Sequence, residues 1–332
     1  MRILNANDVR QALPMPAAID AMRTAFAALA SGRADVPPRT HLRIDRHDGD
    51  TLVMPAYLSS DDAEAALAVK VVSVFPNNGE ANLPRINAAV VVLDPATGVP
   101  VALLEGAALT GIRTAAASAL ATDLLARPDS RTLAIFGAGV QARTHLEAIC
   151  TVRPIDTAWI YAPTADRVDR LIAELAGRGP IPRDLRRAAT PAEAVSRADV
   201  VCTVTTSSVP VFEDGNVRPG THVNAVGSYK PQVAEVPPET VVRATVVVDE
   251  RAAAWQEAGD LIQPLRAGLI GEEHIRAELG ELVAGSKSGR TSAGQITLFK
   301  SVGNAAQDAA AAQLAVRNAE TMGIGQRITW ND

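Results

Sequence analysis

The stretch RTLAIFGAGVQARTHLEAI, residues 131–149, carries the strongest local signal in the sequence. Residues 132–136 form a short apolar run typical of a buried strand, which leads into Gly137-Ala-Gly-Val-Gln-Ala142 and then into a helical pattern. Gly137 permits a tight turn, Gly139 lets the backbone approach a pyrophosphate, and Ala142 allows close helix–strand packing. Free amides at the helix start favour phosphate charge. In this strand–turn–helix context the motif predicts a dinucleotide-binding unit.

From residue 131 onward, short apolar runs alternate with helical patterns. The runs TAWIYA, DVVCTVTT, THVNAVG and ATVVVDE are separated by stretches such as ADRVDRLIAELAG and PAEAVSRA. Apolar strands that alternate with helices predict a parallel sheet covered on both faces. The expected fold class is therefore α/β, with a Rossmann-type doubly wound parallel sheet.

The residues on either side of this unit follow other patterns. MPAAIDAMRTAFAALASG predicts a helix that ends at Gly32, and ALAVKVVSVF predicts a strand. Two apolar runs around Asp94-Pro-Ala-Thr-Gly98 predict a hairpin. The alanine-rich stretch KSVGNAAQDAAAAQLAVRNAETMG predicts one long helix, outside the alternating unit, that packs back on the first zone.

Composition limits the classes of function. The net charge of −5 and pI of about 5.6 give no basic face that would indicate nucleic acid. No signal peptide is expected at the start, and Arg113 and Asp123 interrupt the apolar-looking run LTGIRTAAASALATDLLA, so no membrane association is expected. Cys150 and Cys202 are expected to be reduced core thiols of a cytoplasmic protein, and no Cys/His spacing predicts a metal site.

The end of the second strand bears on the choice between NAD and NADP. An acidic residue at that point usually holds the ribose 2′-hydroxyl of NAD. The sequence Tyr161-Ala-Pro-Thr164 offers no carboxylate, and Arg167 follows, where a guanidinium can meet a 2′-phosphate. The sequence therefore favours NADP(H), with NAD(H) as the alternative and a solvated helix residue as the other interpretation of Arg167.

Three basic residues precede the dinucleotide unit in unexpected surroundings. Lys70 lies inside ALAVKVVSVF, Arg113 lies inside LTGIRTAAASALAT, and Arg39 lies in PPRTHL. A charged side chain in an apolar run is costly to bury without a partner. Each residue alone is explained by a snorkelling side chain or a surface ion pair. As a set, the three predict a clamp for a carboxylate.

These segments together resemble the ornithine cyclodeaminase/μ-crystallin family over nearly the whole chain. The resemblance runs from MPAAIDAMRTAF to FKSVGNAAQD, and it is carried by Arg39-Thr40, MPAY at 54–57, Lys70, RTAAASALAT at 113–122, FGAGVQA at 136–142, TTSSVPVF at 205–212, EAGDL at 257–261 and KSVG at 300–303. It implies a discontinuous α+β dimerisation and substrate domain (residues 1–117 and 305–332), a Rossmann domain (residues 118–304) and a homodimer. It also implies that Arg39, Lys70 and Arg113 hold the substrate carboxylate and form the catalytic set.

The resemblance implies further site residues. Met54 and Tyr229 are expected beside the substrate. The expected cofactor-binding residues, in addition to Gly137, Gly139, Thr164 and Arg167, are Thr114, Val140, Gln141, Thr205, Thr206, Ser207, Val226, Gly227, Ser301 and Gly303.

The stretch NAVGSYKP, residues 224–231, bears on the reaction. In the cyclodeaminases the corresponding strand is followed by a glycine, an aspartate that handles the distal amine of ornithine, and then a proline. Alignment on Gly227 and Pro231 places Tyr229 in the aspartate position, where it is a poor anchor for an ammonium. The turn is similar to that of family members that reduce imines, such as ketimine and pyrroline-2-carboxylate reductases.

The resemblance thus implies NAD(P)H-dependent reduction of a small cyclic α-imino acid to the L-amino acid. Lys70 or a bound water is the candidate proton donor. Three alternatives remain: ornithine cyclodeaminase, an open-chain amino-acid dehydrogenase such as alanine dehydrogenase, and a dinucleotide-binding protein without turnover. A Tyr229 that faces away from the substrate, with another acid in its place, is the alternative interpretation of the turn.

Overall fold

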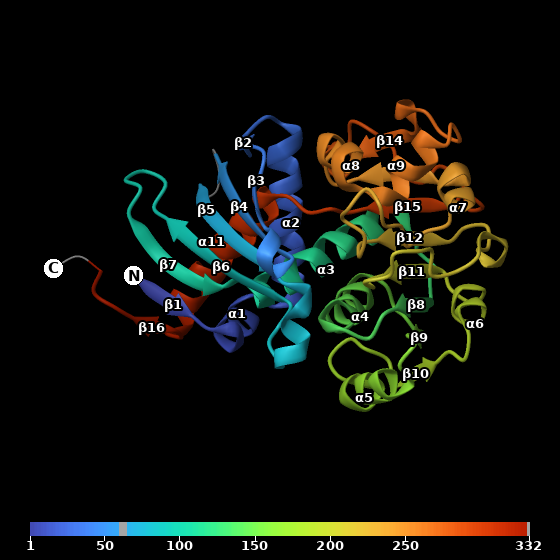
Figure 1. Ribbon diagram of the computed structural model, residues 1–332, viewed down its shortest axis with the longest axis horizontal. Helices are drawn as coiled ribbons and strands as arrows, with labels where there is room; N and C mark the ends of the chain where they lie inside the picture. The colour runs from blue at the N-terminus through green and yellow to red at the C-terminus, as the bar shows by residue number, and fades with distance from the viewer. Residues whose placement is uncertain (60–64, 331–332) are drawn as a thin grey trace. The chain divides into compact units, whose positions relative to one another are not determined.

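A computed structural model describes residues 1–59 and 65–330 of the chain (Figure 1). The chain divides into two compact units: unit 1 comprises Met1–Arg113 and Asn304–Asp332, and unit 2 comprises Thr114–Gly303. The first division falls inside helix α3 (Gly106–Leu125), and the second falls just before helix α11 (Ala305–Met322). The domain roles and the boundaries at residues 117 and 305 stay predictions.

Unit 2 contains an eight-stranded, fully parallel sheet in the order β10-β9-β8-β11-β12-β15-β13-β14. The expected parallel strands are present as β8 (Thr132–Phe136), β9 (Thr157–Tyr161), β11 (Val200–Thr203), β12 (His222–Ala225) and β13 (Thr245–Val248). The sequence did not predict β10 (Asp184–Arg187), β14 (Ile275–Glu278) and β15 (Thr297–Lys300).

Helices cover both faces of this sheet, as the apolar strands predicted. One apolar cluster joins the sheet to α4 (Val140–Val152) and α5 (Ala165–Leu175). A second cluster, on the other face, joins it to α6 (Pro191–Val195), α7 (Pro238–Arg243), α8 (Arg251–Glu257) and α9 (Gly259–Arg266). Helix α10 (Leu279–Val283) follows β14. The prediction of a doubly wound α/β fold is confirmed.

Unit 1 is built on a second sheet, in the order β16-β1-β7-β6-β5-β4-β2, with β3 paired to β4. All of its pairs are antiparallel except that of β1 with β7. Helices α2 (Met15–Ala30) and α11 pack on each other, and α11 also packs on strands β4, β5 and β6 and on α1 (Ala6–Ala12). The strands are β1 (Arg2–Leu4), β2 (Ala34–Asp35), β3 (Thr40–Ile44), β4 (Gly49–Leu58), β5 (Ala66–Val74), β6 (Ile86–Leu93), β7 (Pro100–Glu105) and β16 (Gln326–Arg327).

Several local predictions for unit 1 are confirmed, and one is wrong. The chain leaves α2 through Gly32, whose φ of 69° lies in the left-handed region, and the turn after Asp94 joins β6 to β7 as a hairpin. The stretch KSVGNAAQD was predicted to begin the last helix, but Lys300 ends strand β15 and α11 begins only at Ala305. Asn304 caps α11, because its side-chain oxygen accepts from the Gln307 amide.

Two further observations concern the chain as a whole. Among residues 1–59 and 65–330, no helix has both the length and the apolar character needed to cross a bilayer. Cys150 and Cys202 are buried and unpaired, as expected of core thiols, and burial raises the pKa of both to about 12.

Candidate functional site

The glycine loop of unit 2 joins the end of β8 to the start of α4. Gly137 has a φ of 117°, and a Cβ at this position would lie 2.8 Å from the Val204 carbonyl oxygen. Its amide donates to the Tyr161 carbonyl (2.8 Å), which ties the loop to the end of β9. Both the backbone conformation and the space therefore require glycine at position 137.

Gly139 is the N-cap of α4 and has a different role. Within the part of the chain that the structure describes, no side chain caps the first amides of α4, and a Cβ on Gly139 would meet no atom within 4 Å. The neighbouring Val140 side chain is exposed, whereas Gln141 is partly buried. The α4 N-terminus thus offers unsatisfied amides beside open space, which fits a dinucleotide pyrophosphate.

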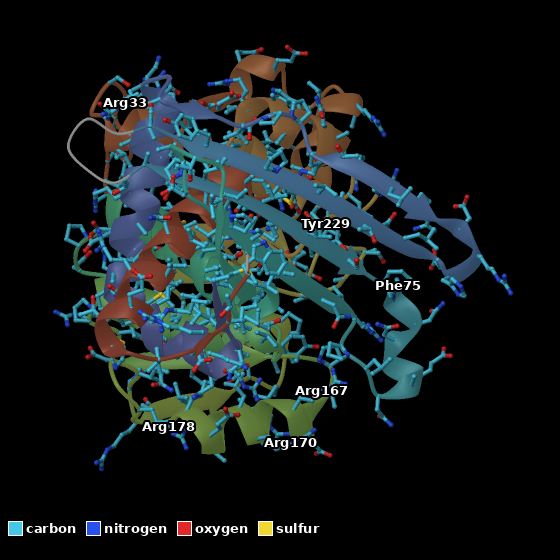
Figure 2. All side chains as sticks on the ribbon, turned by 90° about the vertical axis from the view of Figure 1, so that its left-hand side faces the viewer. Arg33, Phe75, Arg167, Arg170, Arg178 and Tyr229 are labelled. Carbon is cyan, nitrogen blue, oxygen red and sulfur yellow. The ribbon has the colours of Figure 1, made fainter. Side chains whose placement is uncertain are left out.

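The end of β9 contains no carboxylate, as the sequence indicated. Thr164 is the N-cap of α5, and Arg167 lies in the first turn of that helix; both are exposed. Figure 2 shows Arg167 and Arg170 along α5. Within the described residues, no hydrogen bond or ion pair engages the Arg167 guanidinium, whereas Arg170 Nε donates to the Asp166 carbonyl (3.2 Å).

Glu235 holds two of the predicted cofactor loops together. Its carboxylate accepts from the amide and hydroxyl of Thr205 (2.7 and 2.6 Å) and from the amides of Gly227 and Ser228 (2.6 and 3.2 Å). Burial raises the pKa of Glu235, although the Thr205 hydrogen bond opposes the shift. The loops that follow β11 and β12 are therefore fixed to one buried carboxyl group; Thr206, Ser207 and Val226 lie in these same loops.

The turn after β12 contains a second buried network. The Ser228 hydroxyl donates to Asp260, and Lys300 Nζ contacts the Ser228 carbonyl (2.6 Å) and Asp260 Oδ2 (2.8 Å). Lys300 and Asp260 are almost completely buried; burial opposes ionisation of Asp260, but Lys300 holds the pKa of this carboxyl below its usual value. Tyr229 instead remains 40% exposed, and Lys230 Nζ lies 5.9 Å from its ring centroid (Figure 2).

The segment after β15 is arranged around one carboxylate. Asp249 Oδ2 accepts from the Ser301 hydroxyl (3.0 Å), the Val302 amide (2.8 Å) and the Gly303 amide (2.6 Å). These contacts fix the side chain of Ser301 and the backbone of Gly303, both predicted cofactor residues. The last predicted cofactor residue, Thr114, is buried within α3.

The structure brings two of the three predicted clamp residues together in unit 1. Lys70 Nζ lies 2.5 Å from Asp308 Oδ2, and Arg113 Nε lies 2.9 Å from Asp308 Oδ1. Arg113 Nη1 also donates to Gln307 Oε1 at 2.9 Å. The side chains of Lys70 and Asp308 are each 2% exposed, so the ion pair is screened little by solvent.

Burial and the charges around Lys70 together shift the pKa of its ammonium group. Burial lowers the pKa of Lys70 to about 8; Asp308 opposes this shift, and Arg113 and Arg39 add to it. Burial also acts on Asp308, but Arg113 and Lys70 hold the pKa of this carboxyl below its usual value. Arg39 is half-buried just before β3, and Met54 of β4 is the cross-strand neighbour of Lys70.

Sequence reasoning missed the acidic members of these clusters. Asp308, Glu235 and Asp260 received no role, although Asp308 and Asp260 lie in the quoted stretches FKSVGNAAQD and EAGDL. They could have been found from the feature that identified Lys70 and Arg113, which is a charged residue within a largely apolar stretch.

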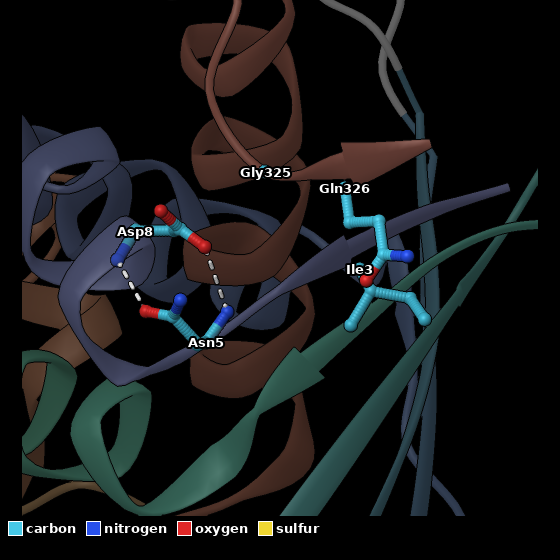
Figure 3. A pocket seen from close by; sticks show the side chains of 5 residues that line it. All are labelled: Ile3, Asn5, Asp8, Gly325 and Gln326. Atoms are coloured by element: carbon cyan, nitrogen blue, oxygen red, sulfur yellow. Dashed lines mark hydrogen bonds between the residues drawn. The ribbon is translucent and has the colours of Figure 1, made fainter. Parts of the chain in front are cut away.

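Unit 1 also contains a cavity that is lined by none of the predicted site residues. Figure 3 shows it lined by Ile3, Asn5, Asp8, Gly325 and Gln326. Asn5 and Asp8 use their side chains to cap α1, since each accepts from the other's backbone amide at 3.0 Å. Among the described residues, no group of three or more His, Cys, Asp or Glu side chains is arranged to hold a metal ion.

Comparison with known proteins shows the family of this chain. The model of the ornithine cyclodeaminase/mu-crystallin family matches residues 1–323. The chain belongs to this family. A Delta(1)-pyrroline-2-carboxylate reductase of Bacillus cereus is 38% identical over 329 residues, with 99% of each chain covered. The family prediction is therefore confirmed.

Two solved structures are similar over the whole length. Delta(1)-pyrroline-2-carboxylate reductase of Thermococcus litoralis, in complex with NADH and L-proline, superposes with a TM-score of 0.94 at 41% identity and covers 99% of this chain and 100% of that one. An archaeal alanine dehydrogenase dimer with bound NAD gives a TM-score of 0.91 at 32% identity, covering 100% and 99%. Both neighbours hold a nicotinamide dinucleotide, NADH in the first and NAD in the second.

Proposed function

We propose that this protein reduces a small cyclic α-imino acid, of the Δ1-pyrroline-2-carboxylate or Δ1-piperideine-2-carboxylate type, to the L-amino acid with NAD(P)H. The main support for this proposal is the buried pair of cations, Lys70 and Arg113. The chain is also 41% identical to a reductase whose structure contains NADH and L-proline. Two buried cations that share one carboxylate keep a net positive charge, which suits a carboxylate ligand.

The substrate carboxylate binds to Arg113, Lys70 and Arg39 in this proposal. A cation and a carboxylate ~4 Å apart attract each other by roughly 4 kcal/mol at an intermediate dielectric. Several such contacts fix the orientation of the ring as well as its affinity. When bound, the reduced nicotinamide supplies a hydride to the imine carbon. The C=N π electrons form an N–H bond with a proton from Lys70 Nζ, and the lysine regains its proton from water.

The turn at Tyr229 supports reduction rather than ornithine cyclisation. An anchor for a distal ammonium requires a carboxylate, and this turn instead presents the Tyr229 phenol with the Lys230 ammonium over its ring. The nearby acid, Asp260, is fully buried and already paired with Lys300. An ammonium placed here would lose hydration without gaining a counter-ion.

The cofactor preference proposed here is NADP(H). The exposed, unengaged Arg167 guanidinium after a strand end without a carboxylate supports binding of a 2′-phosphate. The test is the ratio of kcat/KM for NADPH to that for NADH, before and after Arg167→Ala. We expect NADPH to be preferred and the variant to lose this preference; an unchanged ratio would remove Arg167 from the site.

We also propose a homodimer that forms through the open face of the unit 1 sheet. Val53, Tyr57 and Val71 on β4 and β5 are 37–39% exposed, and Val53 lies directly opposite Val71 in the register. Helix α11 packs on β4 and β5 with Lys70 buried beside it, so the alternate residues point to the opposite face. Adjacent exposed apolar side chains of this kind are typical of an interface.

An oxidation screen with NADPH and NADH tests the function. The substrates are Δ1-pyrroline-2-carboxylate, its six-membered analogue, pyruvate with ammonia, and ornithine with NAD⁺, with ammonia release measured for the last. We expect rapid cofactor oxidation with the cyclic imines and no ammonia from ornithine. Ammonia release without imine reduction would identify a cyclodeaminase, and preferred turnover of pyruvate would identify an alanine dehydrogenase.

A further inference from the structure

The N-terminal end of α11 contacts both buried cations of the clamp. Asp308 accepts from Arg113 Nε and pairs with Lys70 Nζ, while the preceding Gln307 accepts from Arg113 Nη1. The proposed reaction assigns roles to the cations but gives no role to the residues of α11 that hold them.

We propose that Asp308 is a positioning residue that keeps Lys70 charged for proton donation and holds Arg113 in its orientation toward the substrate carboxylate. This inference rests on the proposed function, because that function assigns the proton to Lys70. It makes α11 part of the substrate site rather than only a covering helix of unit 1.

The charges that act on Lys70 come from three segments. Asp308 of α11 stabilises the ammonium, whereas Arg113 of α3 and Arg39 before β3 destabilise it, and burial adds to their effect. Among these three described groups, Asp308 is the acidic one. Its removal therefore leaves a buried lysine facing two guanidinium groups, a setting in which the ammonium loses its proton.

The neighbouring amides indicate what completes this cluster. Gln307 and Asn304 are almost completely buried, and within the described chain Gln307 Nε2 and Asn304 Nδ2 have no hydrogen-bond partner. Because Gln307 Oε1 contacts Arg113, its amide nitrogen lies near the same guanidinium. An unpaired buried donor next to a cation, such as Gln307 Nε2, is a group that an acceptor such as a carboxylate satisfies.

The direction of the pH effect follows from the acid role of Lys70. Donation requires the protonated lysine, so the rate falls as pH rises through the Lys70 pKa of about 8. Replacing Asp308 by Asn lowers this pKa further, so the alkaline loss begins at lower pH. A downward shift of one unit leaves about tenfold less protonated Lys70 above the pKa.

The test combines a lysine titration with pH–rate profiles. The chain has four lysines, at 70, 230, 287 and 300, so NMR of ¹³C,¹⁵N-lysine-labelled protein resolves them, with Lys70→Arg to identify the signal. In Asp308→Asn we expect the Lys70 titration and the alkaline limb of kcat to move down together by roughly one pH unit or more. In the matched control Gln307→Met, KM rises and the Lys70 titration stays in place.

The Lys70 titration and the pH–rate profile distinguish failure of the Asp308 role from failure of the proposed function. An unchanged Lys70 titration in folded Asp308→Asn, or a kcat loss equal at all pH values, would show a purely structural role and overturn the inference. If Asp308→Asn does not fold, Asp308→Ser replaces it: this change also removes the carboxylate, so the Lys70 pKa should fall, and an unchanged value would overturn the inference. A wild type without imine reduction would overturn the proposed function, whatever the NMR titration shows.

Discussion

Arg113 uses two edges of its guanidinium at once. Nε donates to Asp308 and Nη1 to Gln307, so the fork is held in one orientation. A lysine at this position has a single nitrogen and cannot maintain both contacts while binding a carboxylate. We expect Arg113→Lys to raise the KM for the cyclic imine by roughly tenfold or more, with the dissociation constant for NADPH unchanged. Steady-state kinetics and fluorescence titration measure the two, and an unaltered KM would remove Arg113 from the substrate site.

Gly139 allows a sharp test of the phosphate loop. A Cβ there would contact no protein atom within 4 Å, so Gly139→Val should fold normally but fill the space next to the free α4 amides. We expect dinucleotide affinity to fall by about tenfold or more. Gly215, which also has open space around its Cβ position, provides the control variant Gly215→Val. Tight binding by both variants would mean that the glycine motif serves only the turn.

The residues that sequence could identify were those whose charge conflicts with their surroundings. Lys70 and Arg113 qualified because each interrupts an apolar run. Asp308 forms ion pairs with both of these buried cations, yet it lies 195 residues from Arg113 in the chain. Pairing across such a distance depends on how α11 packs on β5, which the local pattern does not contain.

The turn between β12 and α7 is held by an ion pair between distant elements. Lys300 at the end of β15 and Asp260 in α9 meet at Ser228, and both side chains are 0% exposed. Lys300→Met leaves Asp260 buried without its cation, so the free energy of unfolding should fall by about 3–5 kcal/mol. Urea unfolding measures this loss. The double variant Lys300→Met, Asp260→Ser should recover part of it, and equal stability of single variant and wild type would contradict the prediction.

Sequence patterns predicted elements well where one periodicity dominated. Strands β8, β11 and β12 are continuous buried runs, and they were found. The edge strand β10 has the sequence DLRR with one buried residue, so its composition matches a solvated loop. Strand β15 was not predicted for a different reason. Its short run TLFK shares Lys300 with KSVG, and the alanine-rich pattern that follows led to the prediction of a helix from Lys300 onward.

At the scale of the molecule, alternation of strands and helices was sufficient to predict the doubly wound sheet, since only a parallel sheet buries both faces of such strands. The unit 1 sheet was less predictable. Its strands are antiparallel except for the β1–β7 pair, they pair over short and long separations, and β5 has apolar residues on both faces. That second apolar face was not recognisable from sequence, because an outward Val71 and an inward Val72 have the same local pattern.

The exposed apolar face of strands β4 and β5 is expected to form the interface of a homodimer. In a twofold dimer each Val71 lies in the same self-complementary patch on both protomers, so one substitution changes the interface twice. Val71→Asp would place two carboxylates in an apolar contact, where desolvation and mutual repulsion both oppose association. We expect the wild type to sediment as a dimer and Val71→Asp to dissociate at micromolar concentration, with an unchanged circular dichroism spectrum.

Val242→Asp is the matched control, because Val242 in α7 of unit 2 is 40% exposed, compared with 39% for Val71. A monomeric wild type, or a Val71→Asp variant as dimeric as its control, would show that this face is not the interface.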